Sequence, residues 1–423
     1  MRTVRAVALV ASVLFFLHTV FSHAADWPMY RGLNQDGISS EKGDIQWSGD
    51  SPKVVWRKPT NTGFSSFAVS GGKIFTQVVR EIQGKSREIC LTLDATTGRE
   101  LWIADIAKGE GYSGGDTAGG GDGPRSTPTV RDGKVYLLTP DLVTRCLDAD
   151  TGRLIWKRDL MKQDHGRNIG WNSAASVAVD GKLVFVAGGG AGESMLGLDK
   201  NSGEVVWKSG DEIITHSTPV VATIHDQRQV IFFMKSGLVS VDAASGRPLW
   251  KFPFPFKVST AISPVVSGDI VYLSAGYGVG SAACRIEKQG DGFTATRLWF
   301  SPGNDPVVNH WSTPVCKDGY LYGMFGFKKF KKGPMKCVEL ATGKVKWSQP
   351  GFGQGNVILV GNRLVALAED GSLVIVEAVP DAYKEIARTK AFQDKCWTTP
   401  AFADGKIYVR SISQGICFDV SEK

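Results

Sequence analysis

The sequence has few of the signals that mark helical, membrane-spanning or metal-binding proteins. After residue 24 it contains no apolar run long enough for a transmembrane helix, and no long segment with the 3.6-residue period of an amphipathic helix. Its six histidines and seven cysteines form no pair with the spacing of zinc ligands, and the haem-attachment motif C-x-x-C-H is absent. These absences argue against a helical fold, a second membrane-spanning segment, a zinc site of this type and a c-type cytochrome.

The excess of basic over acidic residues is also small. Lysine and arginine total 49 against 42 aspartates and glutamates, which gives a formal net charge of +7 in 423 residues. The charge falls to +5 when residues 1–24 are removed, because that segment carries two arginines and no acid. So weak a basic excess does not indicate a nucleic-acid partner. The dense basic run KKFKKG (328–333) favours a solvated hairpin tip, with nucleic acid or anionic lipid as the alternative.

The N-terminus has the pattern of a secretory signal peptide. Two arginines precede the apolar stretch AVALVASVLFFL, which is too short to span a bilayer comfortably. Small residues at Ser22 and Ala24 match a cleavage site. We expect residues 1–24 to be a signal peptide cut after Ala24, and the mature chain to be periplasmic or secreted. An uncleaved membrane anchor is the alternative.

One motif recurs along most of the chain. Its copies are LDATTGRELW (93–102), LDADTGRLIW (147–156), LDKNSGEVVW (198–207), VDAASGRPLW (241–250) and VELATGKVKW (338–347), with looser copies ending at Trp56 and Trp299. The copies keep the glycine and the tryptophan but replace Asp150 with Thr, Asn or Ala, which argues against a calcium loop. We expect Asp148 to accept hydrogen bonds from its own turn, and the tryptophans to pack between neighbouring units.

A second motif begins each unit. Its clearest forms are STPTVRDGKVYLL (126–138), ISPVVSGDIVYLS (262–274), STPVCKDGYLYGM (312–324) and TTPAFADGKIYVR (398–410). Each indicates two strands joined by a tight turn of the Asp-Gly type. The repeat tryptophans are 43 to 54 residues apart, and four strands at that period indicate a β-propeller.

The count of first-strand motifs predicts eight four-stranded antiparallel blades. The blades are expected to begin near residues 65, 126, 173, 217, 262, 312, 356 and 398. The last blade lacks a fourth strand at the C-terminal end, and PKVVWRKP (52–59) supplies one from the N-terminal end. A blade shared in this way closes the ring without a free edge. We therefore expect an all-β propeller over 52–423, preceded by an N-terminal arm over 25–51.

The combined pattern STPxVxxGxVYxx…LDxxTGxxxW resembles the repeat of the PQQ-like β-propellers. This superfamily includes the quinoprotein alcohol dehydrogenases and the outer-membrane assembly factor BamB. The resemblance covers about 52–420, and DWPMYRGLNQDG (26–37) is similar to the N-terminal segment of secreted members. It implies the propeller fold but specifies no activity, because common folds host many functions.

The enzymatic members of this superfamily bind pyrroloquinoline quinone with a calcium ion, use an aspartate as base and carry a disulfide between adjacent cysteines. No two of the seven cysteines here are adjacent, and no motif matches the calcium ligands or the base. We therefore predict no catalytic residue, no metal ligand and no established cofactor. Pyrroloquinoline quinone with calcium belongs only to the alternative hypothesis. The cysteines that recur before the acidic residue of the repeat are expected to pack as small apolar side chains in third strands.

The candidate binding site lies where the first strands begin, because loops from every blade of a propeller converge at the channel mouth. Seven of the twelve tryptophans end a repeat and two belong to the arm, so the remaining three stand apart at first-strand entries. The predicted binding residues are Arg125, Trp171, Asn172, His216, Lys257, His310, Trp311 and Trp397. Aromatic walls beside cations and imidazoles suit a planar anion, a sugar or a peptide. Tryptophans that plug the channel or pack between blades are the alternative.

Three functional hypotheses follow. The first is an exported, non-catalytic propeller that acts as a scaffold or binding module for a protein, peptide or glycan through one face, as a monomer with no transmembrane segment in the mature chain. The second is an oxidoreductase that depends on pyrroloquinoline quinone. The third is a sugar-binding propeller that uses the same tryptophans. A pocket where a carboxylate, an amide and a base converge beside a metal site favours the enzyme, and a broad exposed patch favours the scaffold.

Overall fold

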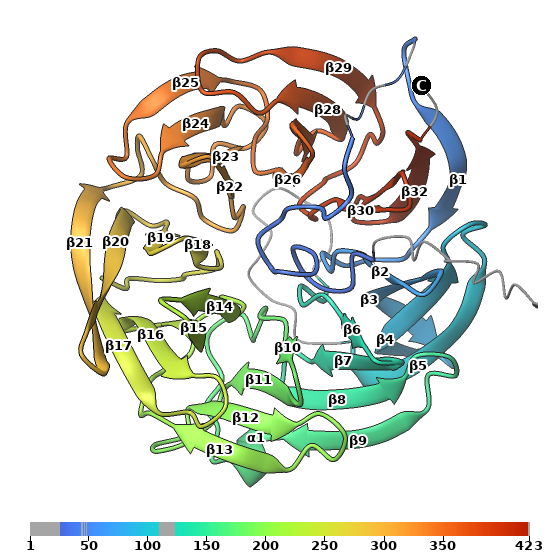
Figure 1. Ribbon diagram of the computed structural model, residues 1–423. Helices are drawn as coiled ribbons and strands as arrows, with labels where there is room; N and C mark the ends of the chain where they lie inside the picture. The colour runs from blue at the N-terminus through green and yellow to red at the C-terminus, as the bar shows by residue number, and fades with distance from the viewer. Residues whose placement is uncertain (1–25, 44, 46, 48, 110–122, 422–423) are drawn as a thin grey trace, which may run out of the picture.

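The structure is a computed structural model that describes residues 26–43, 45, 47, 49–109 and 123–421. The predicted signal peptide and its cleavage site lie outside these residues. Within them, 32 strands form eight four-stranded antiparallel sheets around a central axis (Figure 1). The described residues also form the four-residue helix α1 (Leu160–Gln163), and no helix among them is long and apolar enough to cross a membrane. The predicted eight-bladed all-β propeller is confirmed.

The blades are numbered in chain order, and the strands of each blade are given from the channel outward. Blade 1 contains β2 (Ala68–Ser70), β3 (Lys73–Ile82), β4 (Lys85–Asp94) and β5 (Glu100–Lys108). Blade 2 contains β6 (Thr129–Arg131), β7 (Lys134–Leu138), β8 (Val143–Asp148) and β9 (Leu154–Asp159). Blade 3 contains β10 (Ala178–Asp180), β11 (Leu183–Ala187), β12 (Met195–Asp199) and β13 (Val205–Ser209). Blade 4 contains β14 (Val220–Ile224), β15 (Gln227–Met234), β16 (Gly237–Asp242) and β17 (Pro248–Pro253).

The second half of the chain repeats this plan. Blade 5 contains β18 (Val265–Ser267), β19 (Ile270–Ala275), β20 (Gly280–Gln289) and β21 (Gly292–Pro302). Blade 6 contains β22 (Val315–Lys317), β23 (Tyr320–Met324), β24 (Met335–Glu339) and β25 (Val345–Gln349). Blade 7 contains β26 (Asn356–Val360), β27 (Arg363–Leu367), β28 (Ser372–Glu377) and β29 (Glu385–Lys390). Blade 8 contains β30 (Ala401–Ala403), β31 (Lys406–Arg410), β32 (Gln414–Asp419) and β1 (Lys53–Pro59).

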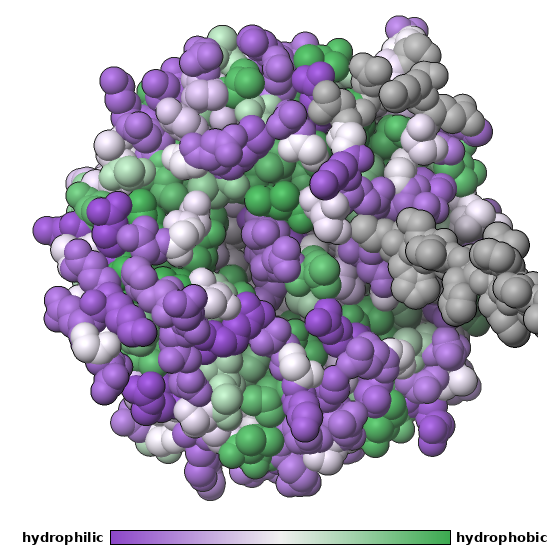
Figure 2. All heavy atoms as spheres, in the orientation of Figure 1, coloured by the Kyte–Doolittle hydropathy of each residue, from purple (hydrophilic) through white to green (hydrophobic). Residues whose placement is uncertain are grey.

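The apolar core lies between adjacent blades. In blade 7, β26 is buried along its whole length and β27 and β28 along most of theirs, whereas every residue of β29 is exposed or half-buried. The sequences of the inner strands are therefore continuous apolar runs, as expected for strands that are buried on both faces. The recurring cysteines are buried and unpaired in third strands, as predicted: Cys90, Cys146, Cys284, Cys337 and Cys417. Figure 2 shows hydrophilic side chains over most of the periphery of one face.

Five of the repeat tryptophans join their blade to the next one through the same contact. The indole N–H of Trp102, in blade 1, donates a hydrogen bond to the Ala149 carbonyl of blade 2 at 3.2 Å. Gly152 of blade 2 has φ +71° and lies against the same indole, so that a Cβ there would stand 2.6 Å from a ring carbon. The same contact recurs as Trp56 with Gly98, Trp156 with Gly203, Trp207 with Gly246 and Trp299 with Gly343. These five tryptophans pack between blades as predicted, and the Trp347 indole likewise donates to the Val379 carbonyl of blade 7 at 2.9 Å. The Trp250 indole instead donates within its own blade, to Gln229 Oε1 at 2.6 Å.

The acidic residue of the repeat organises the turn before the outer strand. Asp148 Oδ1 accepts hydrogen bonds from the Thr151 hydroxyl at 2.7 Å and from the backbone N–H groups of Thr151 and Asp150 at 2.9 and 3.1 Å. These bonds, that of the hydroxyl first, hold the pKa of Asp148 below its ordinary value. The carboxylate therefore acts as an Asx-type turn former, as predicted.

Hydroxyl groups connect neighbouring blades where the first strands begin. Thr127 Oγ1 accepts a hydrogen bond from the Ser66 N–H at 3.1 Å, and the Thr127 N–H donates to Ser176 Oγ at 2.8 Å. The same step recurs from Ser176 to Thr218, from Ser263 to Thr313 and from Thr399 to Ser66. β6 begins at Thr129, so Thr127, the second residue of the STP motif, lies before the strand. Its role is to form the hydrogen bonds between neighbouring blades.

The ring closes in blade 8 through the two ends of the chain. β1 pairs antiparallel with β32, with Arg57 opposite Ile416, which confirms the predicted shared blade. Arg410, at the end of β31, is 1% exposed and donates to the Ser65 carbonyl at 3.1 Å and to Thr76 Oγ1 at 2.8 Å in blade 1. A buried guanidinium with several acceptors thus joins the last blade to the first.

The N-terminal arm crosses one end of the channel (Figure 1, blue). Asp26 accepts a hydrogen bond from Ser70 Oγ at 2.6 Å, beside the β2–β3 turn, and Glu41 accepts one from the Asp404 N–H at 2.6 Å, in the β30–β31 turn. Turns between first and second strands lie at the opposite end from first-strand beginnings. We call the end that the arm covers the arm face, and the other end the cavity face.

Arg31 and Gln35 attach the arm to distant blades. Arg31 is 2% exposed and donates to the Thr313 and Pro314 carbonyls of blade 6, both at 2.7 Å. Gln35 Nε2 donates to the Pro219 carbonyl of blade 4 at 2.9 Å. The arm therefore belongs to the packed structure and closes the arm face.

Candidate ligand-binding site

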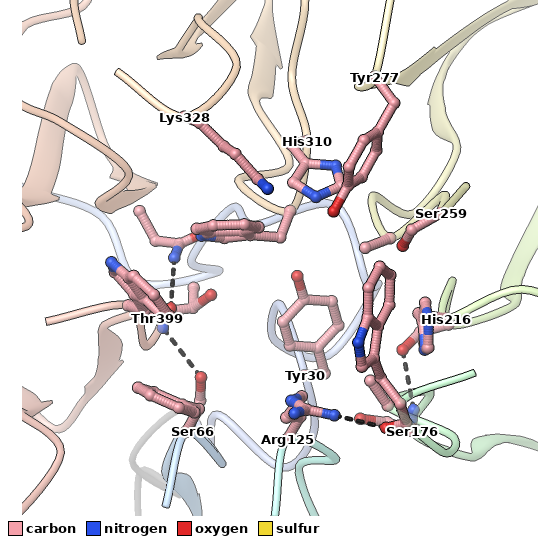
Figure 3. Close-up of a pocket in the computed structure, with 18 of the residues that line it drawn as sticks. Tyr30, Ser66, Arg125, Ser176, His216, Ser259, Tyr277, His310, Lys328 and Thr399 are labelled. Atoms are coloured by element: carbon pink, nitrogen blue, oxygen red, sulfur yellow. Dashed lines mark hydrogen bonds between the residues drawn. The ribbon is translucent and has the colours of Figure 1, made fainter. Parts of the chain in front are cut away.

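A cavity of about 190 Å³ opens on the cavity face, where the first strands begin (Figure 3). Most of its wall comes from connections that run from the fourth strand of one blade to the first strand of the next. The lining residues are Tyr30, Phe64, Ser66, Arg125, Trp171, Ala174, Ser176, His216, Thr218, Ser259, Ala261, Tyr277, His310, Trp311, Lys328, Phe330, Asn356, Trp397 and Thr399. The cavity thus occupies the channel mouth, where the sequence predicted a site.

Six of the eight predicted binding residues line this cavity. They are Arg125, Trp171, His216, His310, Trp311 and Trp397. They belong to the connections that enter blades 2, 3, 4, 6 and 8. The propeller therefore brings together residues that are far apart in the chain because they hold equivalent positions in successive repeats.

Asn172 and Lys257 do not line the cavity. Asn172 Oδ1 accepts a hydrogen bond from Asn168 Nδ2 at 3.3 Å, inside its own connection. Lys257 is exposed and donates to the Gly278 carbonyl at 3.2 Å. Both residues lie in turns rather than strands, so proximity in sequence to a first strand did not determine where their side chains lie.

Aromatic side chains form two walls of the cavity. On one wall Trp397 stacks on Phe64 with ring centroids 5.0 Å apart, and Trp311 lies 4.9 Å from Trp397 at 49°. On the other, Trp171 and Tyr277 are nearly parallel, at 19°, with centroids 6.4 Å apart. Offset and tilted arrangements at these distances are favourable for aromatic rings.

Trp397 is fixed in place from behind by a buried carboxylate. Its indole N–H donates to Glu369 Oε1 at 3.0 Å, and the Gln354 N–H donates to Glu369 Oε2 at 3.1 Å. Asn356 Nδ2 donates to the Trp397 carbonyl at 2.8 Å. Glu369 is only 4% exposed, so its charge is used to position the wall and does not face the cavity opening.

Three lining residues adopt a left-handed backbone that non-glycine residues rarely take. Trp171, Tyr277 and Lys328 have φ of +66°, +58° and +51°. Each such residue costs on the order of 1 kcal/mol or more, and its neighbours must compensate for that cost. Strained residues of this kind occur at ligand-binding sites as well as in turns, and thirteen of the sixteen described here lie outside the cavity.

Cations surround the aromatic walls. The Lys328 ammonium lies 4.9 Å from the ring centroid of Tyr277, and the Lys395 ammonium lies 4.4 Å from that of Trp397. Arg125 donates to the Trp171 carbonyl at 2.8 Å. In Figure 3, Lys328 and Arg125 lie on opposite sides of the cavity. The arrangement offers positive charge next to exposed aromatic faces.

Two buried histidines complete the wall in their neutral form. His216 and His310 are 8% and 5% exposed, and the Nδ1 atom of each has no hydrogen-bond partner among the described residues. Burial lowers the pKa of His216 to about 4, with a further contribution from Arg125. Burial lowers the pKa of His310 to about 3, with further contributions from His216 and Lys328. At neutral pH both rings are therefore uncharged aromatic surfaces.

Five large lining residues were not among the sequence predictions: Tyr30, Phe64, Tyr277, Lys328 and Phe330. Tyr30 reaches the cavity from the arm, which no repeat pattern covers. Lys328 and Phe330 belong to the run interpreted as a solvated hairpin tip; it does join β23 to β24, yet these two side chains line the cavity. The sequence signal that could have identified Lys328 and Phe330 was the length of their loop, 325–334, since long loops in compact domains are usually functional.

The described lining of the cavity does not fit the calcium ion that accompanies the quinone in the enzymatic members of the superfamily. Among the described residues, no aspartate or glutamate lines it, whereas calcium takes roughly six to eight oxygen ligands that include carboxylates. The described residues also contain no group of three or more His, Cys, Asp and Glu side chains that could hold a metal ion. What the walls offer chemically is stacking, positive charge and hydroxyl groups.

Comparison with solved structures shows the same fold in two functional classes. BamB from Moraxella catarrhalis superposes with a TM-score of 0.62 at 16% identity, covering 88% of this chain and 99% of that one. A quinohemoprotein alcohol dehydrogenase from Pseudomonas putida gives 0.67 at 13% identity, covering 94% and 81%. Likeness at these identities shows the fold alone.

Comparison of sequences is more specific. The outer membrane protein assembly factor BamB of Shewanella oneidensis is 22% identical over 298 residues, which are 67% of this chain and 69% of the relative. Across three BamB relatives, the matched region spans 63% to 69% of their length. A family model described as outer membrane protein assembly factor BamB matches residues 85–349. The chain belongs to this BamB family of PQQ-like β-propellers.

Proposed function

We propose that this protein is an exported, non-catalytic propeller that binds a protein partner as a scaffold in outer-membrane assembly. Family membership supports the process, because the matched relatives are outer membrane protein assembly factors. The observation that carries the proposal is the aromatic and cationic cavity of about 190 Å³ on one face of the ring. The partner binds at this cavity face.

The arm supports the choice of face. On the arm face, Asp26 and Glu41 accept hydrogen bonds from the β2–β3 and β30–β31 turns, so the chain itself covers that end of the channel. On the cavity face, connections from successive blades present side chains around an opening. A partner therefore meets an occupied surface at one end and a lined hollow at the other.

The chemistry of the lining supports binding over catalysis. General acid–base catalysis near neutral pH uses groups whose pKa lies near the working pH. The pKa values of His216 and His310 are lowered to about 4 and about 3 by burial, and the described lining offers no carboxylate to orient either ring. Dye reduction by the protein loaded with pyrroloquinoline quinone and calcium would instead support the oxidoreductase.

The proposed location is the periplasm, with residues 1–24 removed as a signal peptide and residues 25–51 acting as an arm to the propeller at 52–423. The N-terminal sequence of the protein recovered from a periplasmic fraction tests this proposal. It is expected to begin at Ala25. A protein that starts at Met1 and sediments with membranes would support the uncleaved anchor.

Site-specific photo-cross-linking in the producing cell tests the binding face. A photoreactive phenylalanine analogue at Lys328 stands on the cavity face, and the same group at Ala244, exposed in the β16–β17 turn, stands on the arm face. We expect a discrete cross-linked protein from position 328 and none from position 244. Cross-linking from 244 alone would place the partner on the arm face and contradict the proposal.

A further inference from the structure

We infer that the interior of the cavity binds one uncharged pyranose ring, such as a hexose unit of a glycan. This inference goes beyond the proposed function, because it assigns a second ligand to the hollow itself and leaves the protein partner at the surrounding rim. It follows from the size of the cavity, the hydroxyl groups that line it and the aromatic faces of its walls.

The size of the cavity limits the occupant to one six-membered ring and its substituents. A dry apolar cavity of about 150 Å³ accommodates benzene, and pockets for drug-sized ligands begin near ~300 Å³. The volume here is about 190 Å³, which lies between these values. A single ring somewhat larger than benzene is therefore the best match, and an extended cofactor is too large.

Hydroxyl groups from five connections between blades line the cavity. They belong to Ser66, Ser176, Thr218, Ser259 and Thr399, which precede the first strands of blades 1, 3, 4, 5 and 8 and are each no more than 8% exposed. Figure 3 shows Ser66 and Thr399 on one side of the cavity, with Ser176 and Ser259 on the other. A ring in the cavity therefore meets hydroxyl groups at opposite edges.

These hydroxyl groups keep hydrogen-bonding capacity for a ligand. Ser66 Oγ accepts the Thr399 N–H at 2.9 Å, and Ser176 Oγ accepts the Thr127 N–H at 2.8 Å. Each of these bonds uses a lone pair of the oxygen and leaves the O–H to donate. The hydroxyl groups of Ser259 and Thr399 have no hydrogen-bond partner among the described residues. Buried polar groups of this kind require polar partners, so the ligand must supply donors and acceptors.

An apolar ring would leave these hydroxyl groups without partners. Transfer of a hydroxyl group out of water without a replacement hydrogen bond is unfavourable. The side chain of a phenylalanine offers no such replacement, whereas a pyranose carries hydroxyl groups around its edge. The lining therefore favours a sugar ring over an aromatic side chain of a protein partner.

The aromatic walls suit the faces of the same sugar ring. Trp311 and Trp397 form one wall, and Trp171 with Tyr277 forms the other. The face of an aromatic ring carries partial negative charge, and the C–H groups of a pyranose carry partial positive charge because oxygen atoms flank them. The C–H groups of the sugar therefore pack on the walls, while its hydroxyl groups reach the serines and threonines.

The charged groups at the walls do not require a charged ligand. The Lys328 ammonium lies over the rings of Tyr277 and Phe327, at 4.9 and 5.4 Å from their centroids. The Glu369 carboxylate lies behind Trp397, where its Oε1 atom is 3.0 Å from the indole nitrogen. Because a cation and an anion both stand at the walls, neither sign of ligand charge is favoured throughout the cavity.

The inference is tested by saturation-transfer difference NMR with the purified mature chain and the methyl glycosides of glucose, galactose, mannose and N-acetylglucosamine. We expect at least one glycoside to bind saturably, with a Kd below about 10 mM. Para-cresol, which reproduces a tyrosine side chain, and cyclohexanol, a ring with one hydroxyl group, are expected to bind at least about tenfold more weakly, equal to about 1.4 kcal/mol. Absence of saturable binding by all four glycosides overturns the inference, and so does binding of para-cresol within about tenfold of the best glycoside.

Two conservative substitutions in the chain locate the sugar. Thr399→Val and Ser259→Ala each remove a lining hydroxyl group and no hydrogen bond between described residues, so both variants are expected to fold. Thr294→Val and Ser348→Ala are the matched controls, because both residues are exposed on outer strands and lie outside the lining. We expect the best glycoside to bind at least about threefold more weakly to each lining variant and to bind the controls with less than about 1.5-fold change. Equal affinities for lining and control variants would place the sugar elsewhere and overturn the inference.

The results separate this inference from the proposed function. Absence of glycoside binding while position 328 still cross-links a partner overturns the sugar site and leaves the scaffold. Glycoside binding that depends on Thr399 and Ser259, without any cross-link from position 328, supports the sugar site and counts against the proposed protein partner.

Discussion

At the scale of single residues, glycine and tryptophan hold neighbouring blades together. Trp102 reaches from blade 1 over Gly152 of blade 2, and only a residue without Cβ leaves room for the indole. The positive φ of the glycine serves the turn, and its missing side chain serves the contact. A single glycine thus meets two separate requirements, the backbone conformation of the turn and the space for the indole.

Gly152→Ala therefore removes more stability than a positive φ alone explains. We expect a loss of about 2–3 kcal/mol in the free energy of unfolding, of which about 1 kcal/mol comes from the backbone and the rest from the forced shift of Trp102. Gly133→Ala is the control, because Gly133 has φ +70° with no atom within 4 Å of the added Cβ. Equal losses in urea denaturation of the two variants would show that the indole contact contributes nothing.

The buried histidines make stability depend on acid. The pKa of His216 is lowered from 6.5 to about 4 in the folded state, so the unfolded chain binds the proton more readily between these values. The free energy of unfolding should fall as pH drops from 6.5 toward 4, by up to about 1.4 kcal/mol per pH unit for this group. Above pH 7 the contribution is fully present.

The variant His216→Gln should flatten this pH dependence. We expect the loss in the free energy of unfolding between pH 7 and pH 5 to be about 2 kcal/mol smaller than in the unsubstituted protein. His225→Gln serves as control, because His225 is exposed in the β14–β15 turn, lies outside the cavity, and its ring contacts a backbone carbonyl. An unchanged pH profile for His216→Gln would contradict the neutral, buried state of this ring.

Much at the residue scale was predictable from sequence. Repetition with a fixed glycine and tryptophan showed which positions were structural, and exceptions to it singled out Trp171, Trp311 and Trp397, all of which line the cavity. Asn172 and Lys257 were not separable from them, because turn residues obey no alternation that places a side chain.

At the scale of elements, the arm behaves as a strap across the ring. Arg31 is buried among backbone carbonyls, and burial lowers the pKa of its guanidinium. No repeat pattern covers the arm, so its route, and the arrival of Tyr30 in the cavity, could not be read from the sequence. Both depend on contacts with blades 4 and 6, which follow the arm by more than a hundred residues.

Loss of the Arg31 guanidinium should detach this strap. Arg31→Met leaves the Thr313 and Pro314 carbonyls without their donor, and we expect a loss of about 3 kcal/mol in the free energy of unfolding together with faster proteolysis of the arm. Leu33→Ala, at an exposed arm position, should change the free energy by less than about 0.5 kcal/mol. An arm that resists protease as well in Arg31→Met as in Leu33→Ala would show that the carbonyl contacts do not hold it.

At the scale of the whole molecule, closure of the ring in blade 8 secures every other blade. The shared blade was predictable because one repeat lacked its last strand and the chain began with a spare one. The two buried arginines that brace the ring, Arg31 and Arg410, were not predictable, since most of their acceptors are backbone carbonyls, which carry no sequence signal.

Proline in the closing strand should therefore act globally. Ile416 is fully buried in the middle of β32, and Ile416→Pro removes a ladder donor there, so we expect a loss of well over 3 kcal/mol or failure to fold. Ile386→Pro is the control, because Ile386 lies at the irregularity of the outer strand β29, where proline is tolerated. Similar thermal midpoints for both variants would contradict closure as the basis of stability.

We propose that the three entry tryptophans form a binding site while the repeat tryptophans hold the blades together. Fluorine NMR of the mature chain labelled with 5-fluorotryptophan tests it in one titration with the purified protein partner captured by cross-linking from position 328, after assignment by single Trp→Phe variants. We predict saturable shifts for Trp171, Trp311 and Trp397, and unchanged resonances for Trp102, Trp156 and Trp207. A saturating titration that moves only the repeat tryptophans, or none of the twelve, would contradict the account.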